Sequence, residues 1–448
     1  MNSAEWQRYI VRFEGVESQL TGLIADTKID EALNIIYRLA ERSYGSELNK
    51  NRKLFYTQLD AAIMQIANVL KIDLEDLSPD ENLQFIIASH FYTTGGHTQI
   101  AKEFCKFSKR NVIIVTDLFE ALSNADKVAI NDIFAPFPVL FLDRDTILGK
   151  TLFIMKLIKN LAPGKISCFN HHQDPIPLVA MMASSNTKKI FYHHSDWKPS
   201  LGASIKECLH VDTTQSGRDI CAGCLNATQP IWASLPSQLV PDSKLLIDKL
   251  SNINTLSMGD AYKYFISEED SPSSYPFAIS EILTMTKGYH FHIGELSSDD
   301  LTTISNVLIS KNIDRDRFFC LGRIPQGARL VQQIINPVYI PSFPIGGGLA
   351  NIDIMAFGVP MLVKKIPVNG DEITLSDIHL SSLLPPQCKY WNDAESLAES
   401  VAFIKENYDE ISQATLKYYL EHHSFEAFAE KINAVIDLSF GQASVISP

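Results

Sequence analysis

The sequence lacks a hydrophobic run that could cross a membrane. Hydrophobic residues make up 46% of its 448 positions, but no apolar stretch reaches about 18 residues, the length that a transmembrane helix needs. The first residues, MNSAEWQRYIVRFEG, lack the basic and apolar regions of a secretory signal peptide. We therefore expect a folded protein that has no transmembrane segment and is located in the cytoplasm.

Positive charge is also scarce. The chain carries 39 lysines and arginines against 52 aspartates and glutamates, a net charge of −13. Its basic residues form nothing longer than pairs such as Lys188-Lys189. Because binding to a phosphate backbone needs a basic surface, this balance argues against nucleic acid as a partner.

Cysteine is infrequent and scattered. The seven cysteines include one CxxC pair, Cys221 and Cys224, with no second pair after it. A single pair at this spacing is explained more simply by two partly buried thiols than by a zinc or redox centre. We therefore expect neither a metal nor another cofactor.

The chain is long enough for two large domains, with or without a small third one. Apolar residues recur at helical spacing in residues 1–75, so we expect a small N-terminal helical region there. Short apolar strands alternate with amphipathic helices in residues 76–245 and again in residues 246–425, and residues 426–448 form a C-terminal helix and tail. The expected fold class is α/β, with two doubly wound, Rossmann-like domains facing across a cleft.

The expected strands of the first α/β domain lie within 83–92, 111–115, 139–142, 166–170, 189–192 and 207–211. Those of the second domain lie within 255–265, 289–296, 316–324, 337–343 and 360–365. We also expect a helix at 99–108, a linker at 230–251 and one long final helix from about 394 to 438.

The most informative stretch is a run of three glycines, Gly346, Gly347 and Gly348. A β-branched run at 338–340 precedes it and a helix-like segment at 349–357 follows. This is an anion-binding geometry, because glycines permit positive φ and close approach while the N–H groups of the first helical turn point outward. The run matches neither GxGxxG nor GxxxxGK[ST], so a tight strand-to-helix turn is the alternative.

Polar residues gather after the expected strands, where ligands bind in parallel sheets. The first domain has them at 93–98, 170–174, 193–196 and 212–218, and the second at 258–263, 290–295, 322–323 and in the glycine run.

Five of these stretches carry a resemblance to a known family. They are TTGGHTQIAKEF, FYHHSDWKPSLGASI, TLSMGDAYKYF, HFHIGEL and YIPSFPIGGGLANIDIMAFGVPML. Together they resemble GT-B glycosyltransferases of the O-GlcNAc transferase and bacterial adhesin N-glycosyltransferase group, and related capsule-type enzymes. The resemblance covers roughly residues 85–425. It implies a GT-B fold with the acceptor side in residues 76–245 and the nucleotide-sugar donor side in residues 246–425.

The resemblance also implies a set of donor-binding residues. They are Tyr262, Lys263, Arg329, Gly346, Gly347, Gly348, Leu349, Ala350 and Asp353. In the family, the lysine of the Tyr-Lys pair holds the donor pyrophosphate, the aspartate binds the ribose hydroxyls, and the position of Arg329 lies near the nucleobase. The family often has Thr or Asn within the phosphate loop, whereas this chain would contact phosphate through backbone N–H groups alone.

The catalytic candidates are His97, His194 and Asp196. An inverting transfer needs a base for the acceptor proton, and His97 combines a glycine-flanked loop with a side chain that titrates near neutral pH. His194 and Asp196 are its competitors, and an acceptor that needs little base help would make none of the three essential. The simpler alternatives are that His97 only hydrogen-bonds its own loop, and that one histidine each of His171-His172 and His193-His194 packs in the core.

Two other functions are compatible with the sequence. Histidines and aspartates at 170–174 and 193–196 are the ligands that a metal-dependent hydrolase or phosphoesterase uses, but the glycine run and Lys263 would then have no role. The second is a catalytically silent, glycosyltransferase-like subunit that stabilises a partner enzyme. The presence of His97, Lys263 and Asp353 argues against it.

We therefore predict an inverting, metal-independent glycosyltransferase, either a hexosyltransferase or an N-acetylhexosaminyltransferase. Its donor is a nucleotide sugar, and by resemblance a UDP-sugar. The acceptor is a protein side chain or a surface glycan, and residues 1–75 contain no repeat that would favour a peptide. A homo-oligomer and a complex with a partner subunit are both compatible with the sequence.

Overall fold

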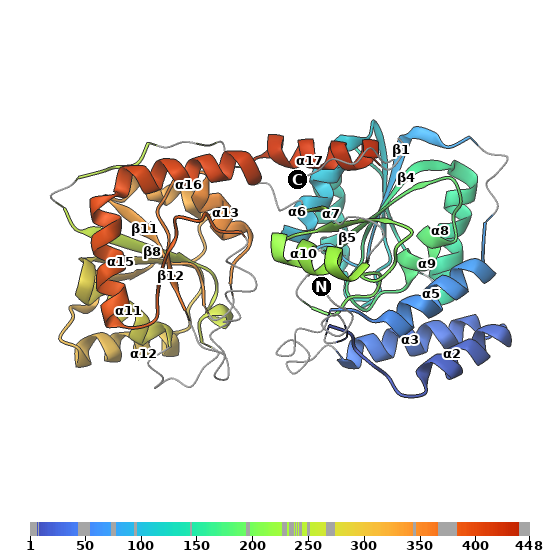
Figure 1. Cartoon of the computed structure of the whole chain (residues 1–448), viewed down its shortest axis with the longest axis horizontal. Helices are drawn as coiled ribbons and strands as arrows, with labels where there is room; N and C mark the ends of the chain where they lie inside the picture. The colour runs from blue at the N-terminus through green and yellow to red at the C-terminus, as the bar shows by residue number, and fades with distance from the viewer. Residues whose placement is uncertain are drawn as a thin grey trace. The chain divides into compact units, whose positions relative to one another are not determined.

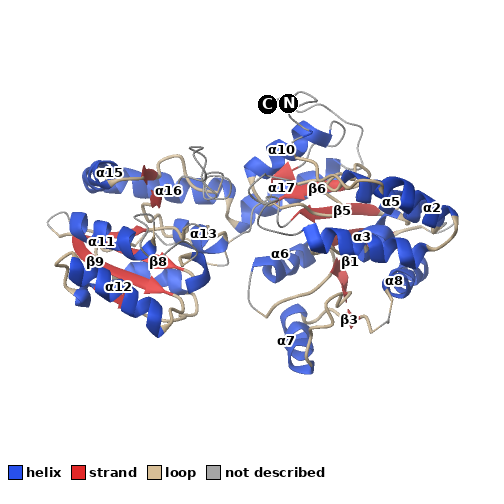
Figure 2. Ribbon diagram, turned by 90° about the horizontal axis from the view of Figure 1, so that it is seen from below, coloured by secondary structure: helices blue, strands red, loops and turns tan. Residues whose placement is uncertain are grey.

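The structure is a computed structural model that describes residues 7, 9–43, 54–72, 78–93, 96–143, 146–193, 198–225, 231–232, 237, 239, 241, 244–248, 251–265, 274–343, 346–365 and 383–438. The chain divides into two compact units, Met1–Ala233 with Glu430–Pro448, and Ser234–Ala429. Each unit contains a parallel sheet flanked by helices (Figure 1, Figure 2), which confirms the expected α/β class. None of the helices in the described ranges is both long and apolar enough to span a bilayer.

The first unit is built on a seven-stranded parallel sheet with the order β3-β2-β1-β4-β5-β6-β7. Its strands are β1 (Asp80–Ala88), β2 (Arg110–Val115), β3 (Val139–Phe141), β4 (Pro163–Phe169), β5 (Lys188–His193), β6 (Leu209–Asp212) and β7 (Ile231–Trp232). Every residue of β4 is buried, because helices cover both faces of a parallel sheet. The first six strands confirm the expected ones, whereas β7 occupies the start of the expected linker.

Helices cover both faces of the first sheet. They are α6 (Gly96–Phe104), α7 (Asn124–Phe134), α8 (Ile147–Leu161), α9 (Ile176–Met182) and α10 (Gln215–Leu225), and the 3-10 turn η1 (Cys105–Phe107) follows α6. Figure 1 shows α6 and α7 on one side of the central strands β1 and β4, with α8 and α9 on the other. The first unit is therefore doubly wound, as expected.

The expected N-terminal helical region is present. It consists of α2 (Val16–Ala25), α3 (Ile29–Ser43) and α5 (Thr57–Val69). Leu33 of α3 and Ile63 of α5 are fully buried and share one hydrophobic core with α8 and α9. The buried carboxylate of Asp60 accepts hydrogen bonds from the backbone N–H groups of Gly202 (2.7 Å) and Ser204 (3.0 Å). These contacts fix α5 to the segment that leads into β6.

The second unit repeats the strand order of the first. Its four-stranded parallel sheet has the order β10-β9-β8-β11, and a parallel bridge between Tyr339 and Met361 connects it to the pair β12-β13. The strands are β8 (Ile253–Met258), β9 (Lys287–Ile293), β10 (Phe318–Cys320), β11 (Pro337–Tyr339), β12 (Leu362–Lys364) and β13 (Lys389–Trp391). In both units the chain adds two strands on one side of the first strand and then continues on its other side, as doubly wound folds do.

Two hydrophobic cores lie on the two faces of the second sheet. The helices are α11 (Tyr275–Thr286), α12 (Ser298–Ser310), α13 (Leu349–Met355), α15 (Ala394–Glu406), α16 (Tyr408–His422) and α17 (Phe425–Leu438), with the 3-10 turns η2 (Ala261–Lys263), η3 (Arg315–Arg317) and η4 (Gly327–Gln333). Val338 packs in the core with α11, and its neighbour Tyr339 packs in the core with α13. Side chains alternate along a strand, so one short strand contributes to both cores.

The predicted boundaries of two helices were wrong. The single final helix expected from about 394 to 438 is three helices, α15, α16 and α17. Asn407 ends α15, where its backbone N–H and its side-chain amide both donate to the carbonyl of Phe403. The helix expected at 99–108 is α6, which begins at Gly96 and so includes His97. The expectations rested on the spacing of apolar residues. That spacing detects neither a capping hydrogen bond nor the first residue of a helix.

Candidate functional site

His97, Lys263 and the glycine run each follow a strand at which one of the two sheets changes strand order. In a doubly wound sheet, the helices after two neighbouring strands leave in opposite directions at such a switch point, and a crevice opens at the carboxyl ends of those strands. The first unit has its switch point between β1 and β4, and the second between β8 and β11. His97 follows β1, Lys263 follows β8, and the glycine run follows β11.

Backbone contacts hold the strand ends of the second sheet close together. The N–H of Gly259 donates to the carbonyl of Ile293 (2.9 Å), and the N–H of Gly294 donates to that of Gly322 (2.9 Å). Gly294 has a φ of 144°, and a Cβ there would lie 2.0 Å from the carbonyl oxygen of Gly259. Only glycine fits this position, because the two backbones approach each other too closely for a side chain.

An ion pair joins the ends of β8 and β10. Arg323 donates to both carboxylate oxygens of Asp260, at 2.8 and 3.3 Å, and Asp260 also accepts from the backbone N–H of Glu295 at 3.0 Å. The hydrogen bond from Arg323 holds the pKa of Asp260 below its usual value. The sequence placed Arg323 after a strand, but Asp260 is 63 residues away, and local sequence patterns do not reveal such a pair.

Lys263 is the last residue of η2 and is partly buried. Burial lowers the pKa of Lys263, and nearby Asp260 opposes that shift. Its Nζ lies 5.9 Å from the ring centre of Tyr262, whose side chain is exposed. Within the described part of the chain, no carboxylate lies within 4.0 Å of this ammonium group. A desolvated cation without an anionic partner is suited to an anionic ligand.

The backbone conformation of the glycine run differs from the expected one. Gly348 has a φ of −89°, and Gly347 is not among the glycines with positive φ, so a left-handed backbone does not explain these two glycines. A Cβ at Gly347 would meet its nearest neighbours at ordinary contact distances of 3.5 to 3.7 Å. Packing among the described residues therefore does not require glycine at position 347, and the close approach of a ligand remains as a reason for it.

Two buried polar atoms beside Gly347 were missed by the sequence analysis. They are Oγ of Ser342 and Oδ1 of Asn351, and neither has a hydrogen-bond partner among the residues that the structure describes. The amide nitrogen of Asn351 donates to the carbonyl of Gly347. Buried polar atoms are nearly always hydrogen-bonded, so a polar ligand at this loop would satisfy them. Their signal in the sequence was only their position beside the glycines.

Asp353 lies on α13, one turn beyond the glycine run. Oγ of Ser237 donates a hydrogen bond of 2.6 Å to its Oδ1. Burial raises the pKa of Asp353 to about 6, and the bond from Ser237 opposes that shift. Ser237 precedes it by 116 residues, and the sequence analysis did not identify it as a site residue.

Arg329 lies on η4, farther along the same edge of the sheet. Gly327 of this turn lies against Ile293, the last residue of β9. The side chain of Arg329 is exposed, and its Nε donates to Oε1 of Gln326 at 2.7 Å. The predicted role of Arg329 near a nucleobase stays a prediction.

His97 lies in the first turn of α6, next to the switch point of the first sheet. Its Nε2 donates a hydrogen bond of 3.0 Å to the carbonyl of Phe169, the last residue of β4. A carbonyl can only accept, so this bond places the proton on Nε2 and leaves the lone pair on Nδ1. Nδ1 is buried, and the ring packs against Phe91 and His171. His194 and Asp196 lie outside the described residues.

Other histidines singled out in the sequence are buried or partly buried. Burial lowers the pKa of His171 to about 2 and that of His172 to about 3. His290 and His292 lie inside β9 rather than after it, and the hydroxyl of Tyr275 joins them at 3.0 and 2.8 Å. Among the described residues, one group of side chains could hold a metal ion, and residues 170–174 contribute no ligand to it. The structure therefore does not bring the two histidine-rich stretches of the hydrolase hypothesis together in that group.

Comparison with solved structures identifies this architecture. The chain is similar to a glycosyltransferase from Rickettsia africae, with a TM-score of 0.55 and 12% identity, covering 81% of this chain and 100% of that one. It is similar to HepE from Anabaena in complex with UDP, with a TM-score of 0.54 and 10% identity, covering 79% and 99%. It is also similar to an O-GlcNAc transferase mutant from Thermobaculum terrenum, with a TM-score of 0.50 and 10% identity, covering 94% and 82%.

No protein-family model and no curated protein matches the sequence. At identities of 10 to 12% the similarity concerns the fold. The fold that the resemblance implied is confirmed: the chain has the two-domain GT-B fold of glycosyltransferases.

Proposed function

We propose that the protein is a glycosyltransferase that binds a UDP-sugar at the switch point of its second sheet. The observation that carries the proposal is the set of unsatisfied groups at that point. Among the residues that the structure describes, Lys263 has no carboxylate partner, Ser342 and Asn351 each bury a polar atom without a partner, and packing does not require Gly347. A diphosphate that carries a ribose would supply an anion and hydroxyl groups to this set.

One structural neighbour supports the choice of nucleotide, and another supports the transfer of a sugar. HepE was crystallised with UDP, and the Thermobaculum protein is an O-GlcNAc transferase. We assign to Lys263 the neutralisation of the charge that develops on the leaving diphosphate. The N–H groups of Gly346, Gly347, Gly348, Leu349 and Ala350 bind its phosphates, Asp353 binds the ribose hydroxyls, and Tyr262 and Arg329 border the nucleotide.

The proposed reaction is a displacement with inversion. The acceptor atom attacks the anomeric carbon from the face opposite the diphosphate, the bond to the diphosphate oxygen breaks with its electron pair, and a base takes the acceptor proton. His97 is the proposed base, with His194 and Asp196 as the alternatives. The acceptor is a protein side chain or a surface glycan, the transferred group is a hexose or an N-acetylhexosamine, and the transfer needs neither a metal nor another cofactor. The proposed location is the cytoplasm.

A thermal-shift screen against UDP, GDP, ADP, CDP and TDP, with and without EDTA, tests this proposal. We expect UDP to raise the unfolding temperature more than the other nucleotides, with no loss of the effect in EDTA. Calorimetric titration with UDP and with uridine then measures how much of the affinity comes from the diphosphate. Stabilisation by none of the nucleotides, or only in the presence of a divalent cation, would contradict the proposal.

A further inference from the structure

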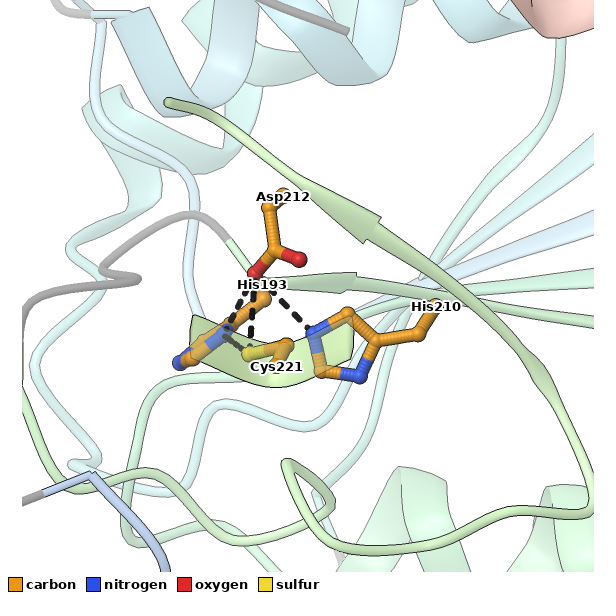
Figure 3. Close-up of side chains that lie close together, drawn as sticks. All are labelled: His193, His210, Asp212 and Cys221. Carbon is orange, nitrogen blue, oxygen red and sulfur yellow. Dashed lines mark hydrogen bonds and ion pairs between the residues drawn. The ribbon is translucent and has the colours of Figure 1, made fainter. Parts of the chain in front are cut away.

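Four buried side chains of the first unit point toward one another at the carboxyl ends of β5 and β6 (Figure 3). They are His193 on β5, His210 and Asp212 on β6, and Cys221 on α10. One nitrogen, oxygen or sulfur atom from each lies within 4.8 Å of those of the other three. All four side chains are at most 1% exposed.

The sheet itself brings these residues together. The parallel register of β5 and β6 aligns Phe191 with His210 and His193 with Asp212. Aligned residues, and residues two apart on one strand, face the same side of a sheet. His193, His210 and Asp212 therefore share one face, and α10 places Cys221 in the same core.

Hydrogen bonding alone accounts poorly for the arrangement. Oδ1 of Asp212 lies 3.0 Å from Nδ1 of His193, 3.0 Å from Nε2 of His210 and 3.5 Å from Sγ of Cys221. Its other oxygen, Oδ2, is buried and has no partner among the described residues. A hydrogen-bonded carboxylate would normally distribute its donors over both oxygens. Here all three neighbouring atoms lie around Oδ1, and Oδ2 has no partner among the described residues.

The cluster is also not arranged as a nucleophilic triad. A Cys-His-Asp triad uses both ring nitrogens of the histidine, one for the thiol and one for the carboxylate. Sγ of Cys221 lies 4.0 Å from Nδ1 of His193, and Asp212 contacts the same nitrogen. Nε2 of His193 is buried and faces neither of them. The geometry therefore does not match a relay, whereas four possible ligand atoms within 4.8 Å of one another are close enough to share one ion.

We propose that His193, His210, Asp212 and Cys221 bind a Zn²⁺ ion. Tetrahedral zinc with bonds of about 2.0 Å to nitrogen and oxygen and about 2.3 Å to sulfur places ligand atoms about 3.3 to 3.6 Å apart. Four of the six separations are 3.0, 3.0, 3.5 and 4.0 Å, which bracket that value, and all six are at most 4.8 Å. The carboxylate and a thiolate together neutralise the charge of the ion, and the thiol proton leaves to solvent when the ion binds.

Four protein ligands and full burial make this a structural site. A catalytic zinc keeps one position open for water or substrate, whereas all four positions here are protein atoms. The ion would fasten α10 to the carboxyl ends of β5 and β6 and takes no part in the proposed transfer. The sequence analysis included His193 in the ligand set of the hydrolase alternative, but it explained Cys221 as a partly buried thiol and gave His210 no role. It therefore did not identify this group of four.

The metal content of the full-length chain tests the proposal. The protein is purified from zinc-supplemented cells, passed through a chelating resin and measured by plasma mass spectrometry. We expect about one zinc per chain in the wild type and less than about a tenth of that in Cys221→Ser and His210→Ala. Cys208→Ser is the matched control, because Cys208 is also buried and directly precedes β6 but lies outside the cluster. A wild type without zinc, or a Cys221→Ser variant that keeps it, would overturn the proposal.

A second measurement does not depend on variants that fold. Wild-type protein produced in zinc-free medium with Co²⁺ should show intense visible bands of tetrahedral cobalt and a near-ultraviolet thiolate-to-cobalt band. The unfolding temperature should fall when the metal is removed and recover when zinc is present during refolding. Weak octahedral bands, or an absent thiolate band, would contradict the ligand set. UDP affinity serves as the independent readout, because the zinc site predicts no change in it for Cys221→Ser.

Discussion

Oγ of Ser237 donates a 2.6 Å hydrogen bond to Oδ1 of Asp353, which fixes the carboxylate of a residue one turn beyond the glycine run. The backbone N–H of Leu239 donates to the same hydroxyl at 3.0 Å, so Ser237 is itself held in place. A carboxylate fixed in this way meets the hydroxyls of a ribose without first losing side-chain freedom. Ser237 is thus a positioning residue for the proposed donor site.

The stability of the protein should depend on the charge of Asp353. Burial raises its pKa from 3.8 to about 6, so the fold favours the protonated form. The penalty for ionisation is absent below about pH 4 and grows as the pH rises through 6, to on the order of 2 to 3 kcal/mol. Asp353→Asn, which stays neutral, should therefore unfold at a higher temperature than the wild type at pH 7.5 and at the same temperature at pH 4. An equal loss of stability at both pH values would contradict this.

Lys263→Ala should weaken the binding of UDP about tenfold to a hundredfold, because a charge-assisted hydrogen bond to the diphosphate is lost. Binding of uridine, which has no phosphate, should not change. Calorimetry with both ligands measures the difference. Lys417→Ala is the control, since that lysine is 75% exposed in the same unit. If both ligands lose affinity equally, Lys263 does not contact the diphosphate.

Gly347→Ala should leave stability unchanged to within about 0.5 kcal/mol, because its Cβ meets only ordinary contacts. It should nevertheless lower UDP affinity about tenfold, since the methyl group would occupy the approach of the phosphate. Gly294→Ala should behave in the opposite way and destabilise the fold, because its Cβ would lie 2.0 Å from a carbonyl oxygen. Thermal unfolding and calorimetry on both variants separate the two effects. Unchanged UDP affinity in Gly347→Ala would remove the loop from the binding site.

His97→Ala should lower kcat for the donor sugar by about a hundredfold or more with little change in its KM, if this histidine is the base. Release of UDP, in the presence of an acceptor found by screening peptides and oligosaccharides, measures both constants. His90→Ala is the matched control, because His90 packs in the same aromatic group, 6.5 Å from His171. A rise in KM alone would make His97 a binding residue, and the test would move to His194 and Asp196.

The architecture was predictable because buried parallel strands leave a strong pattern. The residues of β4 and β8 read as short apolar runs between amphipathic helices, and the structure confirms them as strands. The wrong predictions concern single residues and very short segments. Asn407 divides a long amphipathic stretch by capping a helix end with its side chain, and β7 has only two residues, too few for a pattern.

The contacts that complete each site were not predictable from the sequence. Asp260 pairs with Arg323 across 63 residues and Ser237 with Asp353 across 116. The proposed zinc site depends on the register of β5 and β6, which aligns His193 with Asp212. Spacing along the chain reveals which residues follow strands, but only the strand order and register determine which of them meet.

The central claim is that the second unit binds a nucleoside diphosphate at its switch point, and a crystal structure of the chain with UDP tests it most directly. The account predicts the diphosphate within hydrogen-bonding distance of the N–H of Gly347 and of Nζ of Lys263, with the ribose hydroxyls on Asp353. UDP bound at another place, or absent at saturating concentration, would contradict it.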